Sequence, residues 1–197
     1  VIGNGHPVPE RKWSKASPEV VLWLANLKAL KRPQDFIEMV ESSHIADTRF
    51  WIVGQPIDRD VHKYVALKAQ EIPSLTYHGG CDINECNEYF QKASVYVHTG
   101  ATEGFPNTFI QSWLHEVPVI SLNANPDRVL DDESVGYHCE SIGGAIARIR
   151  ELIDRPEVRA RMGRTASTYA IEHHTIAAVV NRLESHLKRS AERPSES

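Results

Sequence analysis

The feature that most constrains this chain is a regular alternation between short, continuous apolar runs and longer amphipathic stretches. The apolar runs predict five strands, at Val20–Ala25, Arg49–Val53, Leu75–His78, Val95–His98 and Pro118–Leu122. Helical spacing of apolar residues between them predicts helices at Pro33–Val40, Asp58–Glu71, Asn84–Ala93 and Pro106–Glu116. Strands that are apolar throughout belong to a sheet with both faces covered. We therefore expect an α/β domain with a doubly wound parallel sheet.

The last third of the chain has a different pattern, because it is almost entirely amphipathic. We expect helices at Ile142–Ile153, Pro156–Glu172 and Ile176–Leu187. The division that follows is a linker remnant over residues 1–19, one domain over 20–190 and a polar, disordered tail over 191–197. The opening Val1-Ile2-Gly3-Asn4-Gly5 lacks a methionine and resembles the middle of a protein, so we expect a fragment.

The size and the net charge of the chain argue against some classes of function. A chain of 197 residues with 41% hydrophobic content can bury one good core. Its formal charge of −4 argues against nucleic acid as the main partner, because binding to phosphate backbones requires clustered Lys and Arg. No apolar run is long enough to cross a bilayer. Six arginines between Arg148 and Arg164 could attract an anionic membrane surface, but the acids among them favour a solvated helix face.

The three cysteines indicate thiols rather than a disulfide framework. Cys81, Cys86 and Cys139 form an odd set in a chain without a secretory signal, which fits a reducing cytoplasm. The spacing of Cys81 and Cys86 also misses the usual zinc-binding pattern. We therefore expect a cytoplasmic protein with free cysteines and neither metal nor cofactor.

The segment from Thr99 to Asn107 is the best candidate for chemistry. It follows a predicted strand and opens a helix; Gly104 allows close approach to the backbone, and Pro106 presets the first helical turn. The unpaired amides of that turn, together with the helix dipole, form a seat for an anion such as phosphate. A strand, turn and helix with Gly and Pro could also be purely structural. In a doubly wound sheet the turns after Asn26, Val53, His78 and His98 all face one crevice.

Several motifs in this order resemble a known family. Glu103-Gly104-Phe105-Pro106-Asn107 to Gln111, followed by Val117-Pro118-Val119-Ile120, resembles the E-G-F-x(5)-E and P-V-I motifs of the retaining GT-B glycosyltransferases of family 4 (group 1). Further matches are Lys31-Arg32-Pro33, Phe50 to Gly54, Tyr77-His78-Gly79 and the Val1 to Gly5 linker. The resemblance spans about residues 1 to 187. It implies the Rossmann-like C-terminal half of a GT-B fold, with a helical C-terminal segment.

This resemblance implies a donor-binding domain for a nucleotide diphosphate sugar, such as a UDP-sugar. The enzyme would be a hexosyltransferase of polysaccharide biosynthesis that transfers a sugar to a hydroxyl of a sugar or lipid-linked acceptor. The acceptor-binding N-terminal domain would be missing, so this chain alone would be inactive. Alternatives are a non-catalytic nucleotide-sugar-binding module and a GT-B-like hydrolase or epimerase.

The resemblance also assigns roles to individual residues. Glu103 would contact hydroxyls of the transferred sugar, and Lys31 would neutralise the leaving diphosphate. The amides of Gly104, Phe105 and Asn107 would hold that diphosphate. The other candidates for the donor site, by position, are Pro106, Thr99, His98, Gly79, Gly80, Cys81, Gly54 and Asn26.

Two positions depart from the family pattern. Asn26 stands where an arginine is usual, so the donor site has less positive charge to neutralise the diphosphate unless Lys28 or Arg32 supplies it. Gln111 stands where a second glutamate grips the ribose hydroxyls, and its amide offers a weaker, uncharged acceptor.

Overall fold

A computed structural model describes residues 4–10, 15–101 and 103–191 of this chain. Six strands form one parallel sheet in the order β3-β2-β1-β4-β5-β6. Their bounds are β1 Glu19–Leu24, β2 Thr48–Val53, β3 Leu75–Tyr77, β4 Val95–His98, β5 Val119–Ser121 and β6 Gly136–His138. The helices are α1 Pro33–Ser43, α2 Arg59–Glu71, α3 Ile83–Lys92, α4 Asn107–Leu114, α5 Val129–Asp132, α6 Ile142–Asp154, α7 Pro156–His174 and α8 Ile176–Ala191. Two short 3-10 turns, η1 Ala29–Lys31 and η2 Pro126–Arg128, complete the described elements.

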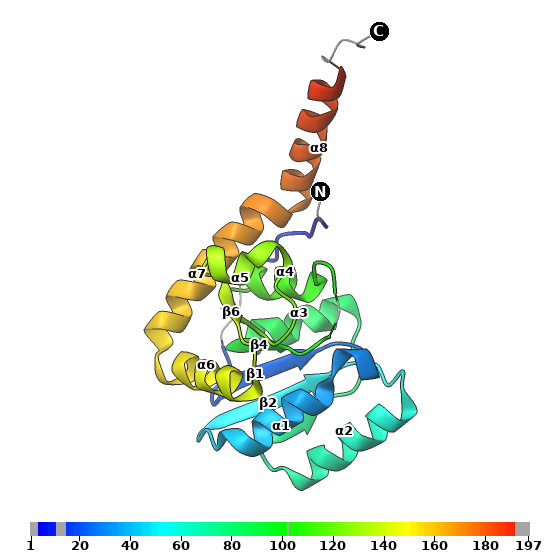
Figure 1. The fold of residues 1–197 in the computed structure, drawn as a ribbon, viewed down its shortest axis with the longest axis vertical. Coiled ribbons are helices and arrows are strands. Elements are labelled where there is room, and N and C mark those ends of the chain that lie inside the picture. Colours follow the sequence, from blue (N-terminus) through cyan, green and yellow to red (C-terminus); the bar gives the residue numbers. More distant parts are fainter. Residues whose placement is uncertain (1–3, 11–14, 102, 192–197) are drawn as a thin grey trace.

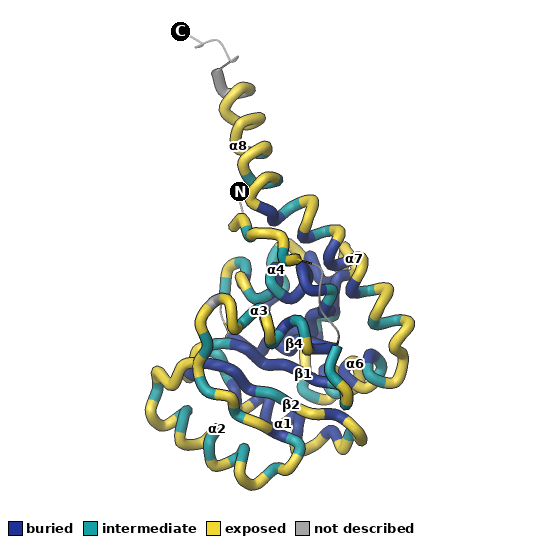
Figure 2. The backbone as a smooth tube through the Cα atoms, turned by 180° about the vertical axis from the view of Figure 1, so that it is seen from behind, coloured by how far each residue is buried: buried dark blue, intermediate teal, exposed yellow. Residues whose placement is uncertain are grey.

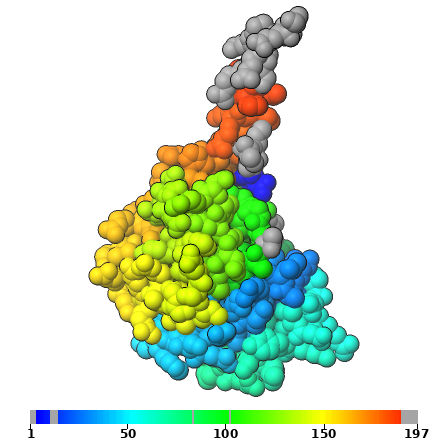
Figure 3. All heavy atoms as spheres, in the orientation of Figure 1, coloured from blue at the N-terminus to red at the C-terminus, as the bar shows by residue number. Residues whose placement is uncertain are grey.

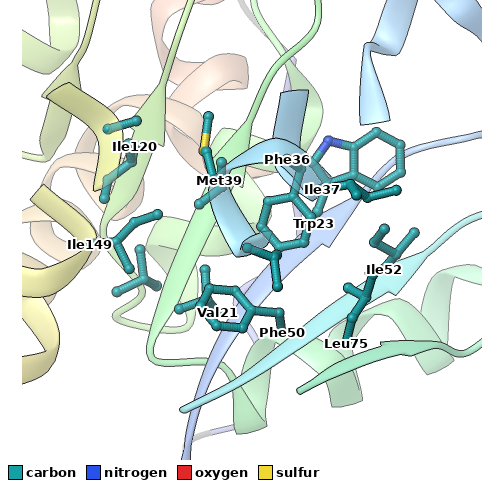
Figure 4. Close-up of a cluster of buried hydrophobic side chains, with 14 of the residues drawn as sticks. Val21, Trp23, Phe36, Ile37, Met39, Phe50, Ile52, Leu75, Ile120 and Ile149 are labelled. Atoms are coloured by element: carbon teal, nitrogen blue, oxygen red, sulfur yellow. The ribbon is translucent and has the colours of Figure 1, made fainter. Parts of the chain in front are cut away.

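The doubly wound, Rossmann-like architecture predicted from the apolar alternation is confirmed (Figure 1). Successive residues of β1 point to opposite faces of the sheet. Val21 and Trp23 pack in the core beneath α1, α2 and α6, whereas Leu22 and Leu24 pack beneath α3, α4, α5 and α7. Figure 4 shows the first of these cores, with Phe50 beside Val21. The rings of Phe36 and Phe50 meet edge to face, with 6.1 Å between their centroids. Both faces of the sheet are therefore buried, which explains why its strands are apolar throughout (Figure 2).

The structure adds one strand that the sequence did not predict. β6 is a short Gly-Tyr-His segment that pairs in parallel with β5. It has no apolar run, so periodicity cannot identify it. The fourth helix begins one residue later than predicted. Pro106 has an extended backbone, with ψ 125°, and α4 begins at Asn107. The predicted tail over 191–197 lies, apart from Ala191, outside the described residues.

The C-terminal helix extends away from the sheet, as Figures 1 and 3 show. Its base is fixed by the N-terminal segment, because His6 N–H donates to the His174 carbonyl at 2.8 Å and Ile176 N–H donates to the His6 carbonyl at 3.2 Å. The early linker residues therefore lie at the junction of α7 and α8, close to the start of α4.

Candidate functional site

The predicted crevice lies where the strand order reverses. β1 is flanked by β2 on one side and β4 on the other, so the loops after β1 and β4 leave the sheet in different directions. Hydrogen bonds join these two loops: Thr99 Oγ1 donates to the Lys31 carbonyl at 2.7 Å, and Ala101 N–H donates to the Leu30 carbonyl at 3.0 Å. The loops that carry Lys31 and Glu103 are thus held together at the switch point.

A compact charge cluster occupies this point. The Lys31 ammonium forms an ion pair with Glu103 Oε1, and His98 Nε2 lies 3.4 Å from the same oxygen. The adjacent His98 imidazole, followed by the Lys31 ammonium, lowers the pKa of Glu103 to about 2, against the opposing effect of burial. Glu103 is therefore a carboxylate at neutral pH. The two residues predicted to carry the chemistry, 72 positions apart, are brought into contact.

The main-chain donors of the predicted anion seat are present beside this cluster. Within the described residues, the N–H groups of Gly104, Phe105 and Asn107 donate to no backbone carbonyl. Gly104 and Asn107 are exposed, and a Cβ added at Gly104 would meet nothing within 4 Å. Nothing in the described fold therefore requires a glycine there, whereas a ligand pressed against the backbone would. Pro106 is buried and precedes the helix.

The side chains of α4 contact the N-terminal segment and a small recess. Asn107 Oδ1 accepts a hydrogen bond of 2.7 Å from Asn4 Nδ2 and lies 3.3 Å from His6 Nε2. Gln111 lines a recess of about 180 Å³, together with His6, Pro7, Pro9, Asn84, Asn87, Leu114 and His115. The sequence did not predict that Asn4 and His6 reach the site, because no local pattern signals a contact across 100 residues.

Thr99 and Gly54 help to hold the loops of the crevice together. Thr99 is fully buried, and its hydroxyl also accepts a hydrogen bond of 2.8 Å from Trp23 Nε1. It therefore helps to hold the loops after β1 and β4 in place from the side of the core. Gly54 is buried as well, and a Cβ there would overlap the carbonyl oxygen of Ala25. Its glycine is required by the close approach of the loops after β1 and β2.

The other predicted positions lie in loops at the same edge of the sheet. Asn26 is exposed in the loop after β1. Gly79 has φ +81°, a conformation that favours glycine, and its carbonyl accepts from Gly54 N–H at 2.7 Å. Gly80 is exposed beside Gln55. Of the two residues considered as substitutes for a missing arginine, Arg32 is engaged with Asp35 at 2.7 Å, whereas Lys28 is exposed.

The expectation of free thiols at Cys81 and Cys86 is wrong. These cysteines form a disulfide, with their Cα atoms 5.8 Å apart, whereas Cys139 is free and buried. Asp82 caps α3 by accepting from the N–H groups of Asn84 and Glu85, which places Cys81 just before the helix and Cys86 in its first turns. Cys81 therefore cross-links the loop after β3.

The arginine-rich stretch is largely used within the fold. Arg148 pairs with Glu151 at 2.7 Å, Arg150 donates to the Ser43 carbonyl, and Arg159 contacts Glu19. A cleft of about 810 Å³ is lined by residues of β6 and α7 and by none of the residues of the charge cluster. Size alone therefore does not locate the site. In the part of the chain described, no helix combines the length and apolar character needed to span a bilayer, and no group of three His, Cys, Asp or Glu side chains is arranged for a metal ion.

Solved structures with the same architecture include several glycosyltransferases. S. aureus TarM, bound to UDP, α-GlcNAc-glycerol and fondaparinux, superposes with a TM-score of 0.78 at 17% identity over 93% of this chain and 38% of its own. Anabaena HepE with UDP and glucose gives a TM-score of 0.72 at 15% identity, over 86% of this chain and 48% of its own. This chain therefore spans less than half the length of these proteins.

A third match is itself a single domain. The C-terminal domain of the glycosyl transferase group 1 protein LpcC from Francisella tularensis gives a TM-score of 0.70 at 20% identity, over 80% of this chain and 87% of its own. No curated protein sequence matches significantly. The family model described as glycosyl transferases group 1 matches residues 9–169, which include every residue of the charge cluster and the adjoining amides. This chain therefore belongs to the glycosyl transferases group 1 family and has the Rossmann-like fold of GT-B glycosyltransferases.

Proposed function

We propose that this chain is the donor-binding domain of a retaining family 4 glycosyltransferase that takes a sugar from a UDP-sugar. The observation that carries the proposal is the position, next to the Lys31–Glu103 pair, of three main-chain amides that donate to no backbone carbonyl among the described residues. Such amides at a helix start favour a diphosphate. TarM and HepE, which share the fold, were solved with UDP.

In this proposal the main-chain amides, the lysine and the carboxylate of the site bind different parts of the donor. The amides of Gly104, Phe105 and Asn107 hold the diphosphate, and Lys31 neutralises it as the glycosidic bond breaks. Because negative charge accumulates on the leaving group, this contact is stronger in the transition state than in the ground state. Glu103 accepts hydrogen bonds from hydroxyls of the sugar. Charge neutralisation by amides and lysines removes the need for a metal ion, so we propose a metal-free reaction.

The nucleoside would extend from the diphosphate toward the recess beside Gln111. The amide side chains of Asn84, Asn87 and Gln111 there can donate to and accept from a ribose or a base. The acceptor, a sugar or lipid-linked sugar, would bind to a preceding domain, consistent with the length of the related structures. This chain would then bind donor without completing transfer, and we propose a cytoplasmic location, where nucleotide sugars would be available.

A nucleotide-sugar-binding module is the alternative favoured by a specific observation. Gln111 lacks the second charged carboxylate of the family motif, and Asn26 lacks the usual arginine. If the chain joined to its preceding domain binds UDP-sugar but transfers no sugar to any acceptor, the module is the better account.

Thermal unfolding with UDP, GDP, ADP and their sugars tests the donor site, because a ligand that binds only the folded state raises Tm. We expect the UDP compounds to give the largest rise. Gly104→Leu should abolish the rise by filling the open space over the amides. Gly143→Leu is the matched control, since its Cβ also meets nothing within 4 Å but lies on α6. An equal Tm rise in both variants would reject the seat.

A further inference from the structure

In the charge cluster, Glu103 and a bound diphosphate would compete for the same ammonium group of Lys31. The Lys31 ammonium is paired with Glu103, and the Lys31 side chain is 31% exposed while that of Glu103 is 18% exposed. A bound diphosphate needs the same ammonium. When Lys31 turns toward the diphosphate, the half-buried Glu103 carboxylate loses its counter-charge, and a buried unpaired charge is costly.

His98 is the group placed to replace that counter-charge. It is 3% exposed, and its Nε2 lies 3.4 Å from Glu103 Oε1 without the alignment of a hydrogen bond, so this buried nitrogen is unsatisfied within the described structure. The other ring nitrogen, Nδ1, lies 3.5 Å from Ser121 Oγ. A small rotation of the carboxylate released by Lys31 would align it with Nε2.

The groups around His98 leave Glu103 as the charge next to its ring when Lys31 moves away. Around the ring, β5 contributes the Ser121 hydroxyl and α4 the Phe109 ring, at 5.2 Å between centroids. Tyr96 of the same strand is 6.5 Å away, and burial raises its pKa, so it stays neutral. In the part of the chain that the structure describes, the charged groups of this cluster are thus Glu103, which stabilises an imidazolium, and Lys31, which opposes it.

We propose that nucleotide diphosphate binding is linked to proton uptake by His98, which then holds Glu103 in place as a positioning residue. The linked reaction takes neutral His98, one solvent proton and the nucleotide to a complex that contains an imidazolium. The carboxylate exchanges the ammonium of Lys31 for the imidazolium of His98. The inference rests on the proposed donor site and adds a pH-dependent step to it.

Isothermal titration calorimetry with UDP at pH 7.5, in HEPES and in Tris, measures the uptake, because the two buffers have different heats of ionisation. We expect wild type to take up a substantial fraction of one proton per UDP. The dissociation constant should rise with pH between 7 and 8.5, by up to about tenfold per pH unit for a full proton. His98→Asn should bind UDP more weakly, with no uptake and a flat pH profile.

Two further variants separate linkage from a structural role. Lys31→Gln leaves Glu103 dependent on His98 before ligand arrives, so we expect weaker binding and little uptake. His62→Gln, on the far helix α2, should keep the wild-type uptake. Equal apparent enthalpies in both buffers for wild type, or unchanged uptake in His98→Asn, would overturn the inference while leaving the donor site intact. Failure of UDP, GDP and ADP all to bind would instead reject the donor site and the inference with it.

Discussion

Glu103 is the residue whose charge connects stability with the site. Its pKa in the folded state is about 2, below the ordinary 4.5, so the carboxylate contributes stability that is present above about pH 4.5 and is lost as pH falls toward 2. In Glu103→Gln, we expect this part of the acid sensitivity to disappear. Urea unfolding at pH 7, 4.5 and 3 measures it; a parallel loss of stability in both proteins would contradict the assigned charge pairing.

His174 makes a second acid-sensitive contribution, of different origin. It is 6% exposed among Phe105, Trp113 and Tyr169, and burial, reinforced by His173 and Arg182, lowers its pKa to about 4. Because the folded pKa lies below the ordinary 6.5, the unfolded chain binds more protons between these values. The contribution of neutral His174 is therefore lost as pH falls from 6.5 to 4.

We accordingly expect His174→Phe to gain stability relative to wild type as pH is lowered from 7 to 5. Tm measured across this range tests the prediction. His62→Phe is the matched control, a histidine-to-phenylalanine change on α2 that should show no such trend. A constant difference in Tm between His174→Phe and wild type would mean that the pKa of His174 is the same in the folded and the unfolded chain, so that burial does not lower it.

At the level of elements, sequence patterns predicted the strands within one or two residues, because buried parallel strands must be apolar throughout. Sequence reasoning also placed Lys31 and Glu103 on loops that meet, since parallel strands end at one edge of the sheet. Long-range contacts were beyond such patterns. The sequence did not predict β6, the contact of His6 with α4, or the disulfide, since each depends on how distant or irregular segments meet.

We expect two glycines of the crevice to have different roles, one in the packing of the loops and one in ligand binding. Gly54→Ala would place a Cβ on the Ala25 carbonyl, and we expect a loss of roughly 3 kcal/mol or more in the free energy of unfolding. Gly104→Ala meets no atom within 4 Å, and we expect a change within about 1 kcal/mol together with weaker UDP binding. Chemical denaturation of both variants measures the contrast. Equal losses would mean that the loops are not packed as described.

The disulfide stabilises the loop after β3 by closing a short loop. Because Cys81 and Cys86 are separated by 5 positions, loop-closure entropy gives a contribution of roughly 2 kcal/mol. We expect the double variant Cys81→Ser, Cys86→Ser to unfold at lower urea concentration by this amount. Wild type measured with a dithiol reductant should match it. If the reductant changes nothing, the cysteines are not paired in the protein.

For the molecule as a whole, α8 contributes little to the stability of the sheet. Val180, Leu183 and Leu187 are 44%, 39% and 58% exposed along this projecting helix. We expect Leu183→Glu and Leu187→Glu each to change the free energy of unfolding by no more than about 0.5 kcal/mol. Ile149→Glu, in the buried core, is the contrasting control and should prevent folding. A large loss at Leu187 would mean that α8 packs against the domain.

The central claim is that main-chain donors after Glu103 receive a diphosphate at the open edge of the sheet. Amide chemical shifts of the ¹⁵N-labelled chain during titration with UDP test it most directly. We predict saturable shifts centred on Gly104, Phe105 and Asn107, with smaller ones at Lys31 and His98. Shifts confined to the cleft at β6, around Tyr137 and Arg161, with the amides of Gly104 and Phe105 unmoved, would contradict the account.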